Sequence, residues 1–522
     1  MKRKLCCFAL CLALCTCTAL AEGLVDIPSQ ITSADLMQDP DISAAAVIEL
    51  LGNTASCGQK GVAVDGGEIT ITEGGLYMLS GSLTDGQVIV DAGEKETVHL
   101  VLNGADICSS DSAAILVQQA QKVILTLTGG NTLSSTASLL DEKVDAVLYS
   151  KSDLTLNGTG TLTVNTDSGN GIVSKDALLM TGGKIEIYAG NHGLTGKDWI
   201  GITGGSLNIT AGGDGIHAKN SEDAALGSLL ITGGSMSIRS ADDGISASGN
   251  LQIDGGSFEI MAGGGSENGS MKASDAMLWG QQSSTETDSG AKGIKTDGSM
   301  LISGGEFQLD CAGDAVHSNG DISIGGGQWT IRTADDGIHA DGKLHIQDGS
   351  FSIPYCYEGL EGNSVQIDGG TFDIVSTDDG INAAGDTECS IVINGGTVTI
   401  VSGGDCLDSN GSLTLNGGTL NLTCNGNGNT AIDYEFDYVN NGADVSTNDG
   451  SENGSTGLRG GFGRGGHGQK PEFFGQEGMQ PPDQNAAPPS DGGMPRPDGK
   501  RDQFQQPPQE GDFPGKTTAM PK

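Results

Sequence analysis

The chain has 522 residues, of which 86 are glycine and only 4% are aromatic, and its formal net charge at pH 7 is −41. So much glycine and so little aromatic surface argue against a helical bundle or a compact α/β enzyme and favour a chain with many tight turns. A surface this acidic repels nucleic acid and anionic membranes, so neither is expected as a partner.

Residues 1–21 have the pattern of a secretory signal peptide. The basic residues 2–4 precede an apolar run, and residues 19–21 (Ala-Leu-Ala) fit the small-residue cleavage site. The apolar run is too short for a good membrane anchor, and the residues before Cys15 and Cys17 suit a lipoprotein site less well. We therefore expect a protein that is secreted or held at the cell surface, without membrane insertion.

Residues 22–59 are expected to form a linker and a short capping helix. The segment 41–51 (DISAAAVIELL) has the composition of a helix that Gly52 would end. A helix here would cover the open end of a stack of strands, which otherwise exposes unpaired strand edges.

Residues 60–435 contain a repeat with a base period of 22 residues, marked by Gly-Gly pairs such as 182/183, 204/205 and 326/327. Two and four residues after each pair the chain is apolar, and the residue between is polar. This period of two indicates short strands with one buried face. Such strands gain a continuous core only by stacking at ~4.8 Å. With three strands per 22-residue coil, the sequence predicts an all-β, right-handed parallel β-helix.

One apolar column of this repeat is aromatic over successive coils, so we expect a buried aromatic stack. Its members are Phe258, Phe307, Trp329, Phe351 and Phe372. The seven cysteines that follow the signal peptide are odd in number and lack a CxxC spacing, so we expect small buried side chains rather than a disulfide framework.

After the repeat, residues 436–522 are rich in Gly, Pro, Gln and Asp and lose the periodicity. This composition predicts a disordered tail.

A column of mostly acidic residues precedes the last glycine of each coil. Turn chemistry alone explains it, because Asp caps backbone N–H groups and Gly accepts positive φ. However, carboxylates stacked ~4.8 Å apart repel one another by ~1 kcal/mol per pair in water, and a hard cation with oxygen ligands removes that repulsion. We therefore predict calcium in the richest cluster, within about three coils, which combines this column with a second, outward column two residues beyond the glycine. The first-choice ligands are Asp378, Asp379, Glu358, Glu361, Asn382, Asp405 and Asp408, and the second choices are Asp335, Asp336, Asp242 and Asp243.

Three histidines, His217, His317 and His339, share an outward column just beyond the same turns. Only the last two lie in neighbouring coils, so one metal site cannot join all three. We interpret them as surface histidines on a strand.

Several segments closely resemble a family of secreted bacterial carbohydrate-binding proteins. They are residues 80–117, 145–165 and 357–383, and the two copies of DGIHA at 214–218 and 336–340. The resemblance covers about residues 60–435 and implies a pectate-lyase-like β-helix that binds calcium, cellulose and polygalacturonate. Departures occur at positions 170 and 192, where Asn and His replace the acidic residue, so cation binding is not expected in those coils.

The chain has few candidates for contact with a sugar ring. An insertion at 264–292 is expected to form a Ser/Gly-rich loop, and Trp279 within it is the first candidate for stacking on a sugar. Tyr357, Tyr355 and Trp199 are weaker candidates.

Three functions remain open at this point. The first is a non-catalytic, monomeric protein that binds plant cell-wall polysaccharide with calcium along a repeated polar face. The second is a calcium-dependent polysaccharide lyase, which needs a base beside the metal; Arg239 and Arg332 are the main candidates, with Lys292 and Lys295 in the turn column. The third is a cell-surface adhesin or structural rod. We favour the first and leave enzymatic activity uncertain.

Overall fold

The structure of the chain is a computed structural model, which describes residues 23–27, 31–139, 143–270, 291–385, 388–426 and 428–454. The expected signal peptide, Trp279 and the chain after residue 454 lie outside the described residues. Within the described ranges, no helix is long and apolar enough to cross a membrane.

The N-terminal end of the strand stack is made of strands, and the expected capping helix at 41–51 is wrong. A 3-10 turn, η2 (Ile42–Ala44), leads into strand β1 (Ala46–Gly52), which pairs parallel with β5 (Gly75–Leu83). In β1 the side chains of Ile48 and Leu50 point into the core, so alternating burial and pairing override the helical composition. The remaining strands of this end are β2 (Ala55–Ser56), β3 (Val62–Asp65), β4 (Glu68–Ile71), β6 (Gln87–Asp91) and β7 (Thr97–Ser109).

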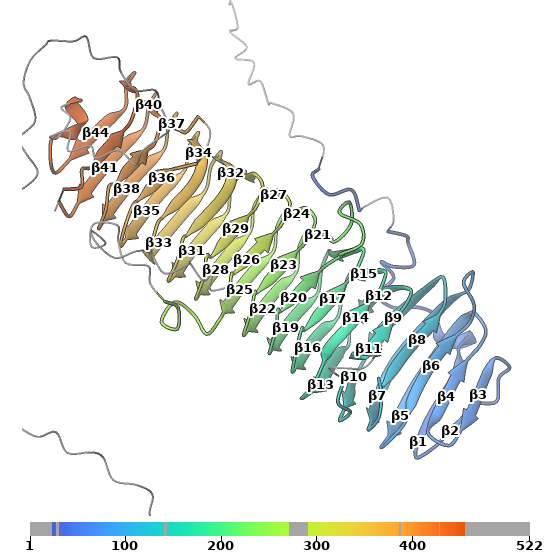
Figure 1. The fold of residues 1–522 in the computed structure, drawn as a ribbon. Helices are drawn as coiled ribbons and strands as arrows, with labels where there is room; N and C mark the ends of the chain where they lie inside the picture. The colour runs from blue at the N-terminus through green and yellow to red at the C-terminus, as the bar shows by residue number, and fades with distance from the viewer. Residues whose placement is uncertain are drawn as a thin grey trace, which may run out of the picture. The chain divides into compact units, whose positions relative to one another are not determined.

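From β7 onward the chain winds through three parallel ladders of strands (Figure 1). Ladder 1 contains β10 (Gly130–Ser135), β13 (Thr161–Thr166), β16 (Lys184–Ala189), β19 (Ser206–Ala211), β22 (Ser235–Ser240), β25 (Ser257–Ala262), β28 (Glu306–Cys311), β31 (Gln328–Thr333), β33 (Ser350–Cys356), β35 (Thr371–Ser376), β38 (Thr397–Ser402), β41 (Thr419–Cys424) and β44 (Asp444–Thr447).

Ladder 2 follows the turns in which the acidic column lies. It contains β8 (Ile115–Gln119), β11 (Ala146–Ser150), β14 (Asn170–Ser174), β17 (Leu194–Gly196), β20 (Ile216–Ala218), β23 (Ile245–Ala247), β26 (Ile294–Thr296), β29 (Val316–Ser318), β32 (Ile338–Ile346), β34 (Leu360–Ile367), β36 (Ile381–Ala383), β39 (Leu407–Ser409) and β42 (Ile432–Tyr434).

Ladder 3 completes each coil, and the long strands β32 and β34 run through both ladder 2 and ladder 3. Its other members are β9 (Lys122–Thr128), β12 (Asp153–Gly158), β15 (Ala177–Met180), β18 (Trp199–Ile202), β21 (Ser228–Ile231), β24 (Leu251–Ile253), β27 (Met300–Ile302), β30 (Ile322–Ile324), β37 (Ser390–Ile393), β40 (Ser412–Leu415) and β43 (Tyr438–Asn440). A second 3-10 turn, η4 (Ser451–Asn453), follows β44.

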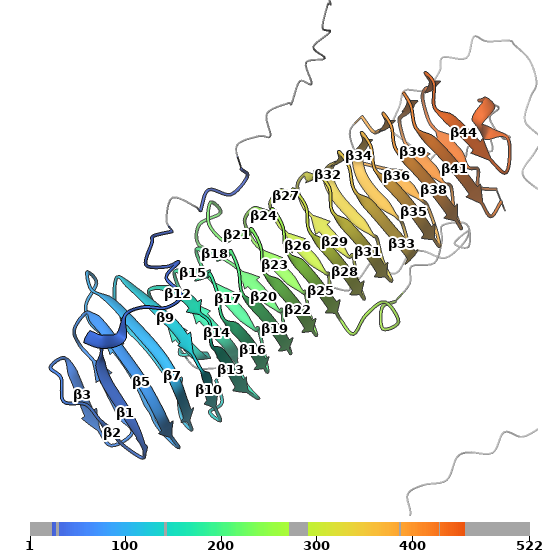
Figure 2. The same ribbon diagram turned by 180° about the vertical axis from the view of Figure 1, so that it is seen from behind.

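The result is an all-β parallel β-helix of about 14 turns, as the sequence predicts. Its strands begin at residue 46 and end at residue 447, so the coiled region extends beyond the expected bounds of 60 and 435 on both sides. Viewed from behind, the strands of successive coils again lie next to one another along the stack (Figure 2).

Two positions of the repeat require glycine, each for a different reason. Gly205, the second glycine of its pair, has φ +92°, a conformation that other residues rarely adopt. At Gly215, which follows the acidic turn residue, an added Cβ would lie 2.3 Å from Ile238 Cγ2 and 2.6 Å from the carbonyl oxygen of Gly244 in the next coil. The coils are therefore stacked too closely at this position for any side chain.

The predicted aromatic stack lies inside the β-helix. Ring centroids are 4.8 Å apart for Phe258 and Phe307, 3.8 Å for Phe307 and Trp329, and 4.7 Å for Phe351 and Phe372, with every pair nearly parallel. All five side chains are buried. Cys311, Cys356, Cys389, Cys406 and Cys424 are buried as well, and none of the described cysteines forms a disulfide.

Residues 23–27 and 31–38 of the N-terminal segment lie along the outer face of ladder 3. The backbone N–H of Val25 donates to Oε1 of Gln252 at 3.0 Å, and the fully buried Asp35 accepts from Lys122 Nζ at 3.1 Å. Val25 also packs with Trp199 in a small apolar cluster. These contacts place the segment on ladder 3.

Candidate functional site

The acidic column is held together by hydrogen bonds from one coil to the next. Oδ1 of Asp314 accepts the backbone N–H of Asp336 at 3.1 Å, and Oδ1 of Asp336 accepts that of Glu358 at 3.1 Å. The same contact joins Oδ1 of Asp379 to the N–H of Asp405 at 2.7 Å. One oxygen of these carboxylates therefore has the turn role that the sequence suggested, which leaves the second oxygen for other partners.

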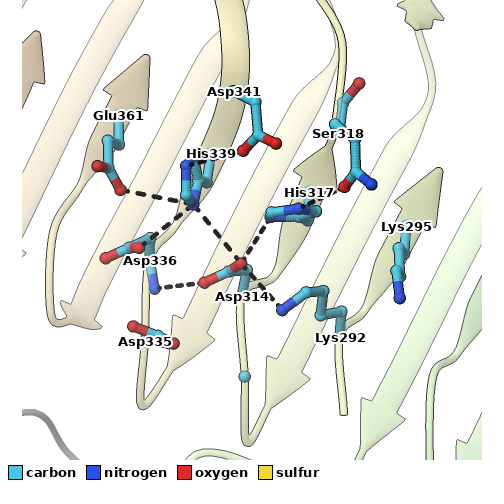
Figure 3. Close-up of polar contacts among 12 residues, drawn as sticks. Lys292, Lys295, Asp314, His317, Ser318, Asp335, Asp336, His339, Asp341 and Glu361 are labelled. Atoms are coloured by element: carbon cyan, nitrogen blue, oxygen red, sulfur yellow. Dashed lines mark hydrogen bonds and ion pairs between the residues drawn. The ribbon is translucent and has the colours of Figure 1, made fainter. Parts of the chain in front are cut away.

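In the middle of the column, the second oxygen faces basic side chains (Figure 3). Asp314 Oδ2 lies 3.3 Å from Lys292 Nζ and 2.8 Å from His317 Nδ1. His339 Nδ1 lies 3.6 Å from Asp336 Oδ2 and 3.5 Å from Glu361 Oε2. The protein supplies its own cations in these coils.

The pKa values follow from this pairing. Burial alone would raise the pKa of Asp314, but the hydrogen bond from His317, the nearby His339 and the charge of Lys292 hold it well below its usual range. Burial alone would lower the pKa of His339, but the carboxylates of Asp314 and Glu361, 3.8 and 3.5 Å from its Nδ1, raise it. Asp314 is therefore ionised, and His339 is biased toward its charged form.

The histidines are partly buried and paired, unlike the surface residues that the sequence suggested. The side chains of His317 and His339 are only 13% and 24% exposed. Upstream, the rings of His192 and His217 stack with centroids 4.3 Å apart beside Asp214. His192 Nδ1 accepts the N–H of Asp214 at 3.0 Å, so an imidazole takes the place of a carboxylate in the column.

This histidine pair was missed by sequence reasoning. The only signal was that His192 stands at an acidic position of the repeat. An imidazole nitrogen accepts a hydrogen bond as a carboxylate oxygen does, but the ring stacking depends on contacts between coils.

Apart from Glu361, which His339 contacts, the described residues in the C-terminal part of the column have no such basic partners. The sequence contains no Lys or Arg between Lys343 and Arg459. Burial, followed by the charges of Glu361 and Asp379, raises the pKa of Glu358 well above its usual range. These carboxylates are therefore crowded together, and among them only Glu361 has a basic partner in the described part of the chain.

The pKa values of three further carboxyl groups in these coils are raised as well. Burial, followed by the charge of Asp408, raises the pKa of Asp379 to about 8 and that of Asp405 to about 7. Burial and the charge of Asp433 raise the pKa of Asp408 to about 6. A bound cation would reverse these shifts, since it favours the charged carboxylates.

Asn382 adds an unpaired acceptor to the same group. It is 8% exposed, and its Nδ2 donates to Oε2 of Glu358 at 3.0 Å. Its Oδ1 is buried without a hydrogen-bond partner. An unsatisfied buried oxygen beside oxygen-only side chains suits a hard cation such as calcium, so the residues of the first-choice site fit this ion.

The second-choice residues also lie close together. Asp242 and Asp243 each place an oxygen within 4.8 Å of one from Asp214, and Asp335 and Asp336 do so with Asp314. A lysine lies beside each group: Lys295 Nζ is 4.0 Å from Asp243 Oδ2, and Lys292 contacts Asp314. The lysines offset part of the repulsion between these carboxylates, which a bound metal would otherwise offset.

Comparison with known proteins gives this chain a family. A family model described as "Carbohydrate-binding domain-containing protein" matches residues 65–337 and 334–461, which is most of the chain. The chain belongs to this carbohydrate-binding domain family.

The chain is also similar to two other known proteins. A carbohydrate-binding domain-containing protein of Acetivibrio thermocellus is 38% identical over 136 residues, which is 25% of this chain and 48% of that protein. The chain thus spans about half the length of this relative. A polysaccharide lyase-like protein from C. thermocellum, solved as a gadolinium derivative, is 36% identical, with a TM-score of 0.41 over 42% of this chain and 92% of that one.

The residues expected to stack on a sugar ring differ in how deeply they are buried. Trp199 is only 9% exposed and packs against Val25 and Ile27, so its ring is not presented as a platform. Tyr355 and Tyr357 are half-buried. These two residues stand next to the turn column and remain candidates.

The residues considered as bases of a lyase have other partners. Arg239 lies near Glu259 and Met261, and Arg332 stands over the ring of Tyr355. Lys292 and Lys295 neutralise carboxylates of the column. The two arginines therefore face the outer side of ladder 1, while the lysines belong to the turns.

Proposed function

We propose that this carbohydrate-binding protein binds plant cell-wall polysaccharide outside the cell, and that calcium held by the turn column takes part. The expected glycans are polygalacturonate first and cellulose second. The metal ligands come from Glu358, Glu361, Asp378, Asp379, Asn382, Asp405 and Asp408.

The observation that carries this proposal is the unneutralised stretch of the column. Its carboxyl groups are buried together, their pKa values are raised, and Oδ1 of Asn382 has no partner. Calcium, when bound, supplies positive charge that both the protein and a uronate carboxylate can coordinate. Such a bridging cation would offset the repulsion between this acidic protein and an acidic polymer.

Space for a sugar lies beside the column. A hollow of about 690 Å³ opens next to Glu361 and His339, and Asp341, Lys343 and Asn363 also line it. Polar groups of alternating charge around an open hollow suit a hydroxyl-rich ligand. Because the coils repeat, one polymer chain can contact several of them and gain avidity.

A pull-down with insoluble polygalacturonate and cellulose tests the proposal, with calcium or with chelator. We expect polygalacturonate binding to rise with calcium, and the variant Asp378→Asn/Asp379→Asn/Asp408→Asn to lose that rise. A matched control, Glu306→Gln/Asp373→Asn, changes exposed acids on ladder 1 strands and should behave as wild type. Polygalacturonate binding by wild type that does not rise with calcium would contradict the proposal, and the appearance of an unsaturated uronate product would instead support a lyase.

A further inference from the structure

A groove on the outer face of ladder 1 lies outside the turn column. It has a volume of about 240 Å³ and crosses strands β22, β25, β28 and β31. Two outward columns line it, and the buried Ile238, Ile260 and Leu309 lie beneath. The outward residues are Ser237, Glu259, Gln308 and Thr330 on one side and Arg239, Met261, Asp310 and Arg332 on the other.

The two arginines of this groove are the only arginines in the part of the chain that the structure describes. Strand register places Arg239 next to Met261, then Asp310, then Arg332 along one column. Three steps of ~4.8 Å separate the arginines by ~14 Å along the stack. In a chain with net charge −41, this placement concentrates guanidinium groups on one face.

The guanidinium groups are available for a ligand. Arg239 is 56% exposed, and its Nη2 lies 3.8 Å from Oε1 of Glu259, which is beyond hydrogen-bond distance. The guanidinium of Arg332 stands 5.5 Å from the ring centroid of Tyr355, a contact that orients it. Both side chains are exposed.

The acidic groups of the groove are weak competitors. Oδ1 of Asp310 accepts the backbone N–H of Ser266 at 2.7 Å, which holds that carboxylate in the neighbouring turn. Glu259 is 64% exposed, and its Oε1 lies 3.8 Å from Arg239 Nη2, which is a long distance for an ion pair. A fixed external carboxylate can displace such an exposed ion pair, because its net stabilisation is small.

Apolar side chains accompany the arginines. Met261 lies between them in the column, and its Sδ accepts from Arg239 Nη1 at 3.2 Å. Exposed apolar residues continue along the outer face of ladder 1, with Tyr188 on one side and Val375 and Val401 on the other. Sugar rings pack their C–H faces on such surfaces while their polar groups find donors at the edge.

We infer that this groove binds the carboxylate groups of an acidic polysaccharide directly, without a metal ion. The inference rests on the proposed function, because it takes the same class of polymer, but it uses another face and another chemistry. A guanidinium offers a planar fork that matches a carboxylate with two parallel hydrogen bonds. A uronate polymer lying along the stack would meet one arginine at each end of the groove.

The test is affinity electrophoresis of the full chain in gels that contain soluble polygalacturonate and excess chelator. We expect wild type to be retarded, and Arg239→Gln/Arg332→Gln to lose at least tenfold in affinity. The control Lys151→Gln/Lys184→Gln removes the same charge from exposed positions elsewhere and should be retarded as wild type. Arg239→Lys/Arg332→Lys keeps the charge without the fork and should recover only part of the binding.

The outcomes separate this inference from the calcium proposal. Chelator-resistant binding that is lost with the arginines and weakened by salt supports the groove, because exposed charge pairs are screened. Failure of wild type to bind in chelator, or equal binding by wild type and the Arg→Gln variant, overturns it. Calcium-stimulated binding that depends on Asp378 and Asp379 remains a separate measurement and can fail or succeed alone.

Discussion

Lys292 Nζ lies 3.3 Å from Asp314 Oδ2, with only 3% and 4% of the two side chains exposed. Lys292 stands in the acidic column itself, since its own N–H donates to Oδ1 of Asp243. This lysine therefore belongs to the part of the column that has basic partners, which ends where His339 contacts Asp336 and Glu361.

Removal of Lys292 should destabilise the protein. Lys292→Met leaves the Asp314 carboxylate buried with only histidines as partners, and we expect a loss of about 3 kcal/mol in the free energy of unfolding. Urea denaturation followed by circular dichroism measures it. Lys292→Met/Asp314→Asn should regain most of the loss, because Asn keeps an acceptor for the N–H of Asp336; a single variant as stable as wild type would contradict the role of this pair.

Stability without calcium should depend on pH. The pKa values of Asp379, Asp405 and Asp408 are about 8, 7 and 6 in the folded protein, above the usual 3.8, first because of burial. The folded state thus holds more protons than the unfolded chain between about pH 4 and pH 8, so stability falls as pH rises through this window. Calorimetry should show a calcium-free Tm that decreases from about pH 5 to about pH 8.

Calcium should counteract this decrease. Its ligands must be deprotonated, so we expect added calcium to raise Tm more at about pH 8 than at about pH 5. The Asp379→Asn/Asp405→Asn/Asp408→Asn variant should show both a flatter pH profile and a smaller effect of calcium. The site would be refuted by a calcium effect on Tm that is as large in this variant as in wild type.

The aromatic stack should contribute strongly to stability. Phe307 lies between Phe258 and Trp329 at centroid distances of 4.8 and 3.8 Å. Phe307→Ala creates a cavity and should cost about 3–5 kcal/mol. Tyr188→Ala, on the outer face and 47% exposed, should change stability by less than about 0.5 kcal/mol; equal effects of the two substitutions in guanidinium denaturation would disprove the buried stack.

The N-terminal segment should detach when Asp35 is replaced. Asp35 accepts from Thr155 Oγ1 at 2.6 Å and from Lys122 Nζ at 3.1 Å. Asp35→Ala removes hydrogen bonds of a charged group, which contribute about 2 kcal/mol. Detachment would uncover Trp199, so we expect a red shift in tryptophan emission and faster proteolysis before residue 45. Asp39→Ala, an exposed change in the same segment, should show neither effect.

The coil, the alternation of buried and exposed residues and the members of each column can be predicted from the sequence alone, because every 22-residue unit repeats the same local pattern. The sequence also identified the aromatic stack and the crowded carboxylates around Asp379. It failed at 41–51, where pairing of β1 with β5 decides a strand against local composition.

The partner of each column residue depends on how the coils pack in three dimensions. Whether Asp314 contacts Lys292 or a histidine, whether Trp199 is covered by Val25, and whether Arg239 and Arg332 line one groove depend on register and side-chain direction between coils. Those contacts join residues far apart in the chain at distances of a few ångströms, and a column alignment gives their order without giving their distances.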